Sequence, residues 1–163
     1  LEEHIKPDKI VNLNDIFTNI KSNFQLVLDK KKINLNIELM DPTLVYGDEE
    51  KLLTVFSNLI DNSIKYSSDG KNIYIKSQNS EGKLIDKNIL ISIKDEGIGI
   101  PQELLPRITE RFFRVDTEKS KKVGGTGLGL AIMKHIISQH RGDYEILSKP
   151  NDGTEIKIYL PTK

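Results

Sequence analysis

The sequence has 163 residues, of which 37% are hydrophobic and 29% are charged, the proportions of an ordinary globular domain. Its 24 Lys and Arg residues balance its 24 Asp and Glu residues, so it lacks both the basic excess typical of nucleic-acid-binding proteins and the acidic excess of a solvating tail. It has no cysteine, which excludes thiolate catalysis, cysteine-ligated zinc and disulfides, and no apolar run approaches the roughly 20 residues that span a bilayer.

The first part of the chain predicts a strand, a helix and a second strand. Residues 10–13 alternate and favour a short edge strand. Asn14 or Asp15 can cap a following helix, because short polar side chains accept hydrogen bonds from the first helical N–H groups. Residues 33–39 alternate apolar and polar side chains, as expected of a half-buried strand. The apolar residues with helical spacing between them are Ile16, Phe17, Ile20, Phe24, Val27 and Leu28.

A long helix is predicted from its cap at Asp48 to about Tyr66. Opposite its apolar side, Asn58, Asn62 and Lys65 follow one another at helical spacing. A solvated polar face is the ordinary interpretation, but Asn is a weak helix former and a poor choice for that role. Amide oxygens suit a hard cation such as Mg²⁺ that triphosphate oxygens already surround, and Lys65 suits a terminal phosphate.

Strands are predicted at residues 73–76 and 89–94, joined by a polar loop, and the second strand leads into residues 95–101, which read DEGIGIP. The glycines allow the backbone to pass close to a flat ligand. Asp95 is placed to accept a hydrogen bond from an exocyclic amine such as that of adenine. Locally, a turn with a solvated carboxylate explains the same residues.

Two further segments suggest a nucleotide site. Residues 111–116 read RFFRVD and precede a charged stretch, which fits either a lid with an aromatic anchor or an ordinary solvated loop. Residues 124–130 read GGTGLGL and open a predicted helix at 128–140, whose free N–H groups attract anions. A plain hinge is the alternative, because the loop has neither the Lys-Ser/Thr of a Walker A motif nor the preceding strand of a dinucleotide fingerprint.

A hairpin of residues 144–147 and 155–160 closes the chain. Strands and helices interleave without regular βαβ alternation. The order therefore predicts an α+β fold, a mixed sheet with helices on one face, rather than a doubly wound parallel sheet.

The order and separation of these segments resemble those of sensor histidine kinases over about residues 10–161. Residues 58–66, which read NLIDNSIKY, resemble the N box of that family, and 95–101 its G1 box. Residues 111–116 are similar to the F box and 124–130 to the G2 box. The resemblance implies the Bergerat ATP-binding fold of the GHKL superfamily: a two-layer α/β sandwich with a mainly antiparallel sheet of about five strands and about three helices on one face.

The resemblance also implies the roles of individual residues. Asn58 and Asn62 would hold Mg²⁺, Lys65 would contact the phosphates, Asp95 would recognise adenine, and Arg114 would support the γ-phosphate. Lys65 and Arg114 are the candidate catalytic residues. The residues expected around ATP are Asn58, Asn62, Lys65, Tyr66, Asp95, Gly97, Gly99, Ile100, Phe113, Arg114, Gly125, Thr126, Gly127, Leu128, Gly129 and Thr154.

The implied reaction transfers the γ-phosphoryl group of ATP to a histidine in a dimerisation and histidine-phosphotransfer domain of the same protein. The acceptor is expected outside this sequence, because His4, His135 and His140 lack its motif. Residues 1–9 are expected to be a remnant of the preceding helix or linker, and residues 10–163 the ATP-binding domain.

The expected partners are that domain and a downstream response regulator, without nucleic acid or membrane contact. The isolated domain is expected to be monomeric and to face the cytoplasm, with a membrane-anchored sensor as a candidate parent protein.

Two other functions fit parts of the pattern. A nucleotide-dependent binding module would dock a partner without phosphoryl transfer. A gyrase-like or chaperone-like ATPase would hydrolyse ATP as an isolated chain. The Asn58 and Asn62 pair favours the kinase, since the ATPase relatives usually place a glutamate on this helix to activate water.

Overall fold

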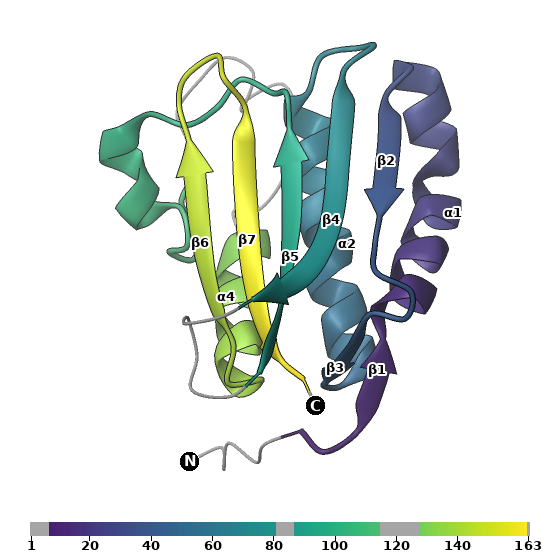
Figure 1. Cartoon of the computed structure of the whole chain (residues 1–163). Helices are drawn as coiled ribbons and strands as arrows, with labels where there is room; N and C mark the ends of the chain where they lie inside the picture. The colour runs from purple at the N-terminus through teal and green to yellow at the C-terminus, as the bar shows by residue number, and fades with distance from the viewer. Residues whose placement is uncertain (1–6, 81–86, 115–127, 163) are drawn as a thin grey trace.

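The computed structural model describes residues 7–80, 87–114 and 128–162. They form two layers, a five-stranded sheet and a set of helices packed on one of its faces (Figure 1). The helices of that layer are α1 (Leu13–Lys31), α2 (Glu49–Tyr66) and α4 (Gly129–Gln139). The strands, in spatial order, are β2 (Asn34–Glu38), β4 (Asn72–Ser80), β5 (Asn88–Asp95), β7 (Thr154–Pro161) and β6 (Asp143–Ser148).

The pairing within this sheet is mixed and mainly antiparallel. Only β2 and β4 run parallel among the described strands, and the chain between them passes through α2, as a parallel pair requires a crossover. The predicted α+β sandwich is therefore confirmed.

Capping residues explain where the two long helices begin. The side chain of Asp48 accepts a hydrogen bond from the N–H of Lys51 at 3.0 Å, which confirms the predicted cap of α2. The predicted cap of α1 was wrong, because Asn12 performs that role through the N–H of Asn14 at 3.1 Å. The side chain of Asn14 instead joins α1 to the chain after β2 by accepting from the N–H of Thr43 at 2.9 Å.

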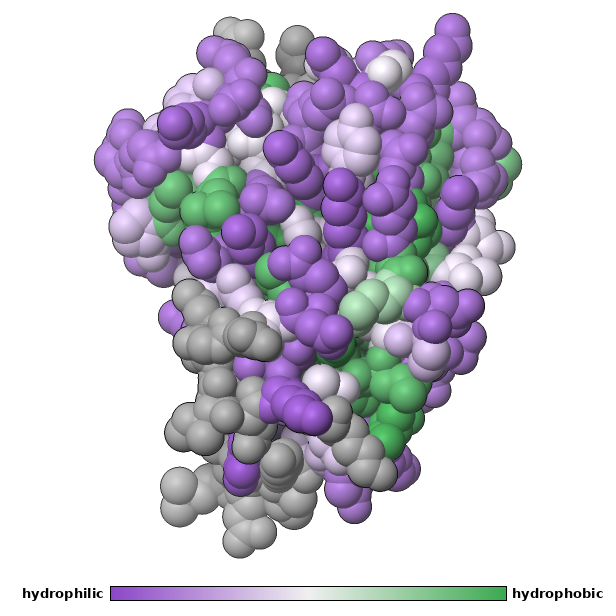
Figure 2. Space-filling view, in the orientation of Figure 1, coloured by the Kyte–Doolittle hydropathy of each residue, from purple (hydrophilic) through white to green (hydrophobic). Residues whose placement is uncertain are grey.

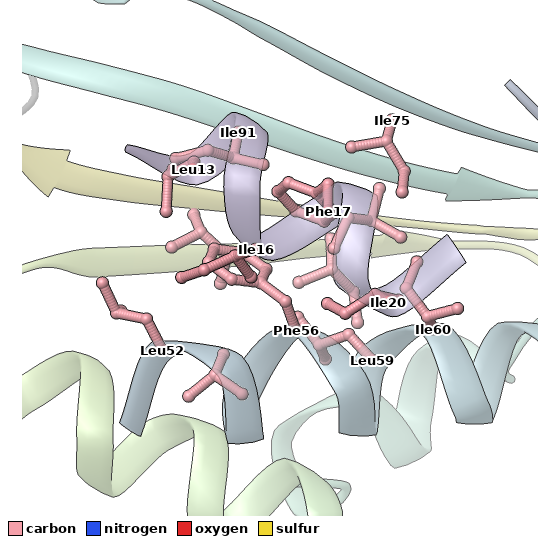
Figure 3. Close-up of a cluster of buried hydrophobic side chains, with 14 of the residues drawn as sticks. Leu13, Ile16, Phe17, Ile20, Leu52, Phe56, Leu59, Ile60, Ile75 and Ile91 are labelled. Carbon is pink, nitrogen blue, oxygen red and sulfur yellow. The ribbon is translucent and has the colours of Figure 1, made fainter. Parts of the chain in front are cut away.

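The main core lies between the helices and the sheet. Phe17 of α1 and Phe56 of α2 meet there with ring centroids 4.9 Å apart, and Ile75 and Ile91 of the sheet lie close by (Figure 3). All four side chains are fully buried. The apolar faces predicted for both helices are thus the faces that pack.

The opposite face of the sheet carries mostly hydrophilic side chains (Figure 2). One row across it consists of Lys76, Ser92, Lys157 and Glu145, which are neighbours in the strand register. This alternation is expected of a sheet with a single covered face.

Four elements differ from the sequence-based expectation. β1 (Ile10–Asn12) is not an edge strand of the main sheet but pairs antiparallel with β3 (Leu44–Tyr46), which was not predicted. A short 3₁₀ helix, η1 (Gln102–Arg107), follows β5, and β4 extends beyond the predicted residues 73–76. No helix in the described ranges is both long and apolar enough to cross a bilayer.

Candidate functional site

A cavity of about 340 Å³ lies where the polar face of α2 meets the end of β5 and the start of α4. This volume is within the usual range of small-molecule sites. The predicted site residues that line it are Asn58, Asn62, Lys65, Tyr66, Asp95, Gly99, Ile100, Phe113, Arg114, Gly129 and Thr154. Segments far apart in the sequence therefore converge on one space.

Asp95, the last residue of β5, is the buried carboxylate of this cavity and is 8% exposed. Its Oδ1 accepts hydrogen bonds from the N–H groups of Gly97 at 2.9 Å and Thr154 at 3.1 Å. Burial raises the pKa of Asp95 above its ordinary value, although these bonds and one with the Ser63 side chain oppose the shift. The carboxylate is thus held in a fixed orientation at low solvent exposure.

Thr154 is oriented by a chain of hydroxyl hydrogen bonds. Ser148 Oγ donates to the carbonyl of Gly153 at 2.9 Å and accepts from the N–H of Ile100 at 2.8 Å. Because a hydroxyl has one proton to donate, the 2.8 Å contact between Ser148 Oγ and Thr154 Oγ1 has Thr154 as its donor. The lone pairs of Thr154 Oγ1 then remain available at the cavity, where they can accept a hydrogen bond.

The two glycines after Asp95 permit the close packing of this loop. A Cβ at Gly97 would lie 2.6 Å from the carbonyl oxygen of Tyr66, so α2 and the loop touch backbone to backbone. Gly99 has φ +72°, and a Cβ there would lie 1.8 Å from the carbonyl oxygen of Lys149. Gly97 does not line the cavity, but it packs against the backbone of Tyr66, which does.

Backbone and side-chain bonds fix the end of α2, which carries Lys65 and Tyr66. The N–H of Ile98 donates to the carbonyl of Tyr66 at 3.3 Å. From α1, Lys31 Nζ donates to the carbonyls of Ile64 at 2.5 Å and Ser67 at 3.0 Å. A cation at a helix C-terminus satisfies carbonyls that have no partner within the helix.

The other end of the cavity is suited to anions. α4 begins at Gly129 without a side-chain cap, and a Cβ at Gly129 would lie 3.6 to 3.9 Å from side-chain atoms of Asn62 and Asn58. The positive end of the α4 dipole therefore meets the amide pair on α2. Lys65 and Arg114 add positive charge to the same space.

The residues at this end also fit a hard divalent cation bound together with phosphates. Within the described ranges, no group of three or more His, Cys, Asp or Glu side chains gathers as a complete metal cage. The amides of Asn58 and Asn62 offer two oxygens from one helix face. Mg²⁺ commonly takes few protein ligands and keeps water and substrate phosphates as the rest.

The two aromatic residues of segment 111–116, Phe112 and Phe113, differ in their position relative to the cavity. Phe113 lines it and packs beneath the guanidinium of Arg107, 4.5 Å from the ring centroid. Phe112 has a positive φ of 64° and is 71% exposed. Of these two aromatic residues, only Phe113 lines the cavity among the described residues.

Several site residues were not predicted from the sequence. Asp61 lies on α2 three residues after Asn58 and four before Lys65, a spacing that already places it on the polar face. Most of the others form the apolar wall and join the cavity only through tertiary packing. The additional lining residues are Leu59, Asp61, Ser63, Ile98, Ile108, Leu130 and Ile156.

Other predictions lie beside the cavity or beyond the described chain. Leu128 is the N-cap residue of α4 and does not line the cavity. Gly125, Thr126 and Gly127, with the proposed lid, lie outside the described residues. Neither His135, which is exposed, nor His140, which is buried, lines the cavity.

His140 has a structural place instead. Its Nε2 accepts from the N–H of Asp48 at 3.0 Å, and its Nδ1 lies 2.8 Å from the carbonyl of Ile136. This pair of contacts requires the neutral tautomer with the proton on Nδ1. The residue thereby joins the end of α4 to the start of α2.

The chain is similar to known proteins over most of its length. Residues 47–163 match the family described as histidine kinase-, DNA gyrase B-, and HSP90-like ATPase. Sensor-like histidine kinase SenX3 of Mycolicibacterium smegmatis is 36% identical over 93% of this chain, and the phosphate regulon sensor protein PhoR of Pseudomonas aeruginosa is 35% identical over 94%. The matches span 38% and 33% of those two proteins, so the chain covers only about a third of their length.

Solved structures show the same fold. The catalytic domain of histidine kinase ThkA is similar with a TM-score of 0.78 and 26% identity, over 94% of each chain. Mycobacterial sensor histidine kinase MprB gives a TM-score of 0.75 at 26% identity, over 94% of this chain and 96% of that one.

Proposed function

Because the chain belongs to the family of histidine kinase-, DNA gyrase B- and HSP90-like ATPases, we propose that it binds Mg-ATP and supplies the γ-phosphoryl group to a histidine on another domain of a sensor histidine kinase. The observation that carries this proposal is the convergence of Asp95, the Asn58 and Asn62 pair and the start of α4 on one cavity. A buried acceptor at one end and an anion site at the other match the two ends of an adenine nucleotide.

The base would bind at the Asp95 end. The carboxylate would accept from the exocyclic amine of adenine, and Thr154 Oγ1 would accept directly or through water. Gly99 and Ile100, which line the cavity, would bring backbone close to the ring plane, and Ile108 and Ile156 would offer apolar surface to its faces. Guanine has a carbonyl where adenine has its amine, so the same carboxylate would disfavour it.

The phosphates would lie toward α2 and α4. Asn58 and Asn62 would hold Mg²⁺, which when bound neutralises phosphate charge and orients the triphosphate. Lys65 and Tyr66 would contact phosphate oxygens, and Arg114 would stabilise the charge that develops on the transferring γ-phosphoryl group. Gly125, Thr126, Gly127, Leu128 and Gly129 would contribute backbone N–H groups.

The acceptor and the partners are part of the same proposal. The γ-phosphorus–oxygen bond to ADP would break as a bond to a histidine nitrogen forms, in a dimerisation and histidine-phosphotransfer domain of the parent protein. A response regulator would then take the phosphoryl group. The domain would work in the cytoplasm as a monomeric unit of a larger sensor.

Labelling of the full-length protein tests the proposal. With γ-labelled ATP and Mg²⁺, we expect a phosphoramidate label that is stable in base and lost in acid. Lys65→Met and Arg114→Met should bind ATP measurably yet lose most of the label, because they act on the transferring group. Failure of the wild-type protein to label a histidine, or variants that bind ATP but label normally, would contradict the proposal.

A further inference from the structure

Asp61 places a negative charge among the residues assigned to the phosphates. It lines the same cavity as Asn58, Asn62 and Lys65. Its Oδ2 lies 2.8 Å from Nζ of Lys65, and the two side chains are 42% and 36% exposed, respectively. Because neither side chain is held by burial, both can respond to a ligand.

This charge opposes a metal-free triphosphate. Lys65 would have to turn from Asp61 toward the phosphate oxygens, which leaves the carboxylate facing groups of its own sign. A divalent cation removes much of this conflict, because it lowers the charge of the triphosphate and keeps water molecules that can donate to a carboxylate. The Asp61 carboxylate therefore weakens binding of the metal-free triphosphate more than binding of the metal-bound one.

We infer that Asp61 is a specificity-determining residue, which makes nucleotide binding depend on the divalent cation by disfavouring the metal-free triphosphate. This inference rests on the proposed function of the cavity. It assigns to Asp61 a role distinct from those of Asn58 and Asn62, which would hold the cation, and of Lys65, which would contact phosphate.

A purely structural role for Asp61 makes a different prediction. An exposed ion pair four residues apart on a helix adds little to the stability of the helix. Such a pair would leave the ratio of affinities for metal-free and metal-bound nucleotide unchanged. That ratio, rather than stability, therefore separates the two roles.

Calorimetric titration with ATP, once in EDTA and once in excess MgCl₂ at equal ionic strength, tests this inference. Asp61→Asn removes the charge and keeps the shape of the side chain. Asp69→Asn is the matched control, because Asp69 is exposed in the turn after α2 and does not line the cavity. We expect the gain in affinity given by Mg²⁺ to fall by at least about threefold in Asp61→Asn, mainly through tighter binding of metal-free ATP, and to be unchanged in Asp69→Asn.

The results separate this inference from the proposed function. Suppose that the wild-type protein binds Mg-ATP but Asp61→Asn keeps the full gain in affinity given by Mg²⁺, or Asp69→Asn loses as much of that gain. The assignment of Asp61 is then wrong, while the proposed nucleotide site stands. If folded wild-type protein binds ATP in neither buffer, both the proposed function and the inference fail. A melting curve for each variant establishes that it is folded.

Discussion

At the scale of single residues, the buried carboxylate of Asp95 combines a cost to folding with its proposed role in binding adenine. Its buried carboxylate has a raised pKa, so its contribution to stability is greatest below the pKa of the unfolded chain and is lost as pH rises through the folded pKa. The proposed recognition of adenine, however, needs the ionised form as the acceptor. On this proposal the site keeps a charge that the fold alone does not favour, as is common where function and stability compete.

The expected result of Asp95→Asn follows from this conflict. The variant should melt no lower than wild type near neutral pH, yet bind ATP roughly tenfold or more weakly, because a charge-assisted hydrogen bond contributes about 1.5–3 kcal/mol. In wild type, ATP affinity should fall with decreasing pH at a pH above the usual aspartate range. Calorimetry over a pH series measures both; a variant with lower stability and normal affinity would contradict the assignment.

Gly99 makes a second prediction at this scale. Gly99→Ala should destabilise the fold by about 2 kcal/mol or more, because backbone strain at positive φ is added to a clash with the Lys149 carbonyl. Gly70→Ala is the control, since Gly70 has φ +80° but a Cβ added there would meet nothing within 4 Å. It should lose about 1 kcal/mol, the cost of the backbone conformation alone. Equal losses in urea unfolding would show that the close approach at Gly99 is unimportant.

At the scale of elements, α2 is the helix that presents the site, and α1 holds its end. Lys31→Met should lower stability by about 1–2 kcal/mol, because it removes charge-assisted hydrogen bonds to the carbonyls of Ile64 and Ser67. ATP affinity should fall as well, since Lys65 and Tyr66 lie on the same turn. Lys30→Met is the matched control on the exposed side of α1 and should change neither urea unfolding nor ATP binding appreciably.

His140 joins α4 to the start of α2, and this contact is sensitive to pH. The pKa of His140 is lowered. Burial is the largest cause of this shift, and the hydrogen bond with the Ile136 carbonyl opposes it. The stability it contributes is therefore present above the pKa of the unfolded chain and lost as pH falls through the folded pKa. Protonation of His140 Nε2 would also abolish the hydrogen bond that it accepts from the N–H of Asp48.

We expect the unfolding free energy of wild type to decrease from pH 7 to pH 5 more steeply than that of His140→Gln, whose amide does not titrate. Urea unfolding at several pH values measures this slope. Identical slopes in the two proteins would show that His140 is not the titrating link.

At the scale of the whole molecule, the sequence predicted those parts of the fold in which the spacing of apolar residues shows which face is buried. The apolar faces of α1 and α2 each required one burial pattern, and each is observed; in β2, Leu35 is buried and Ile37 is half-buried against the core. The pairing of β1 with β3 was not predictable in this way, because three-residue strands carry too little periodicity and their partner is fixed by the folded chain.

The site residues also divide into those that a local pattern predicted and those that it did not. Asn58, Asn62 and Lys65 were predictable from helical spacing, and Asp95 from its position after a strand. Asp61 has equally clear spacing but was not among the predicted site residues. Ile108 and Ile156 carry no chemical signal, and Thr154 entered only through family resemblance, since β7 brings it to Asp95 across the sheet.

A crystal structure of this chain with Mg²⁺ and a non-hydrolysable ATP analogue tests the central claim most directly. We predict the adenine amine within hydrogen-bond distance of the Asp95 carboxylate, and the phosphates between the Asn58 and Asn62 amides and the first turn of α4. An analogue bound elsewhere, or bound in the cavity with its base away from Asp95, would contradict the account.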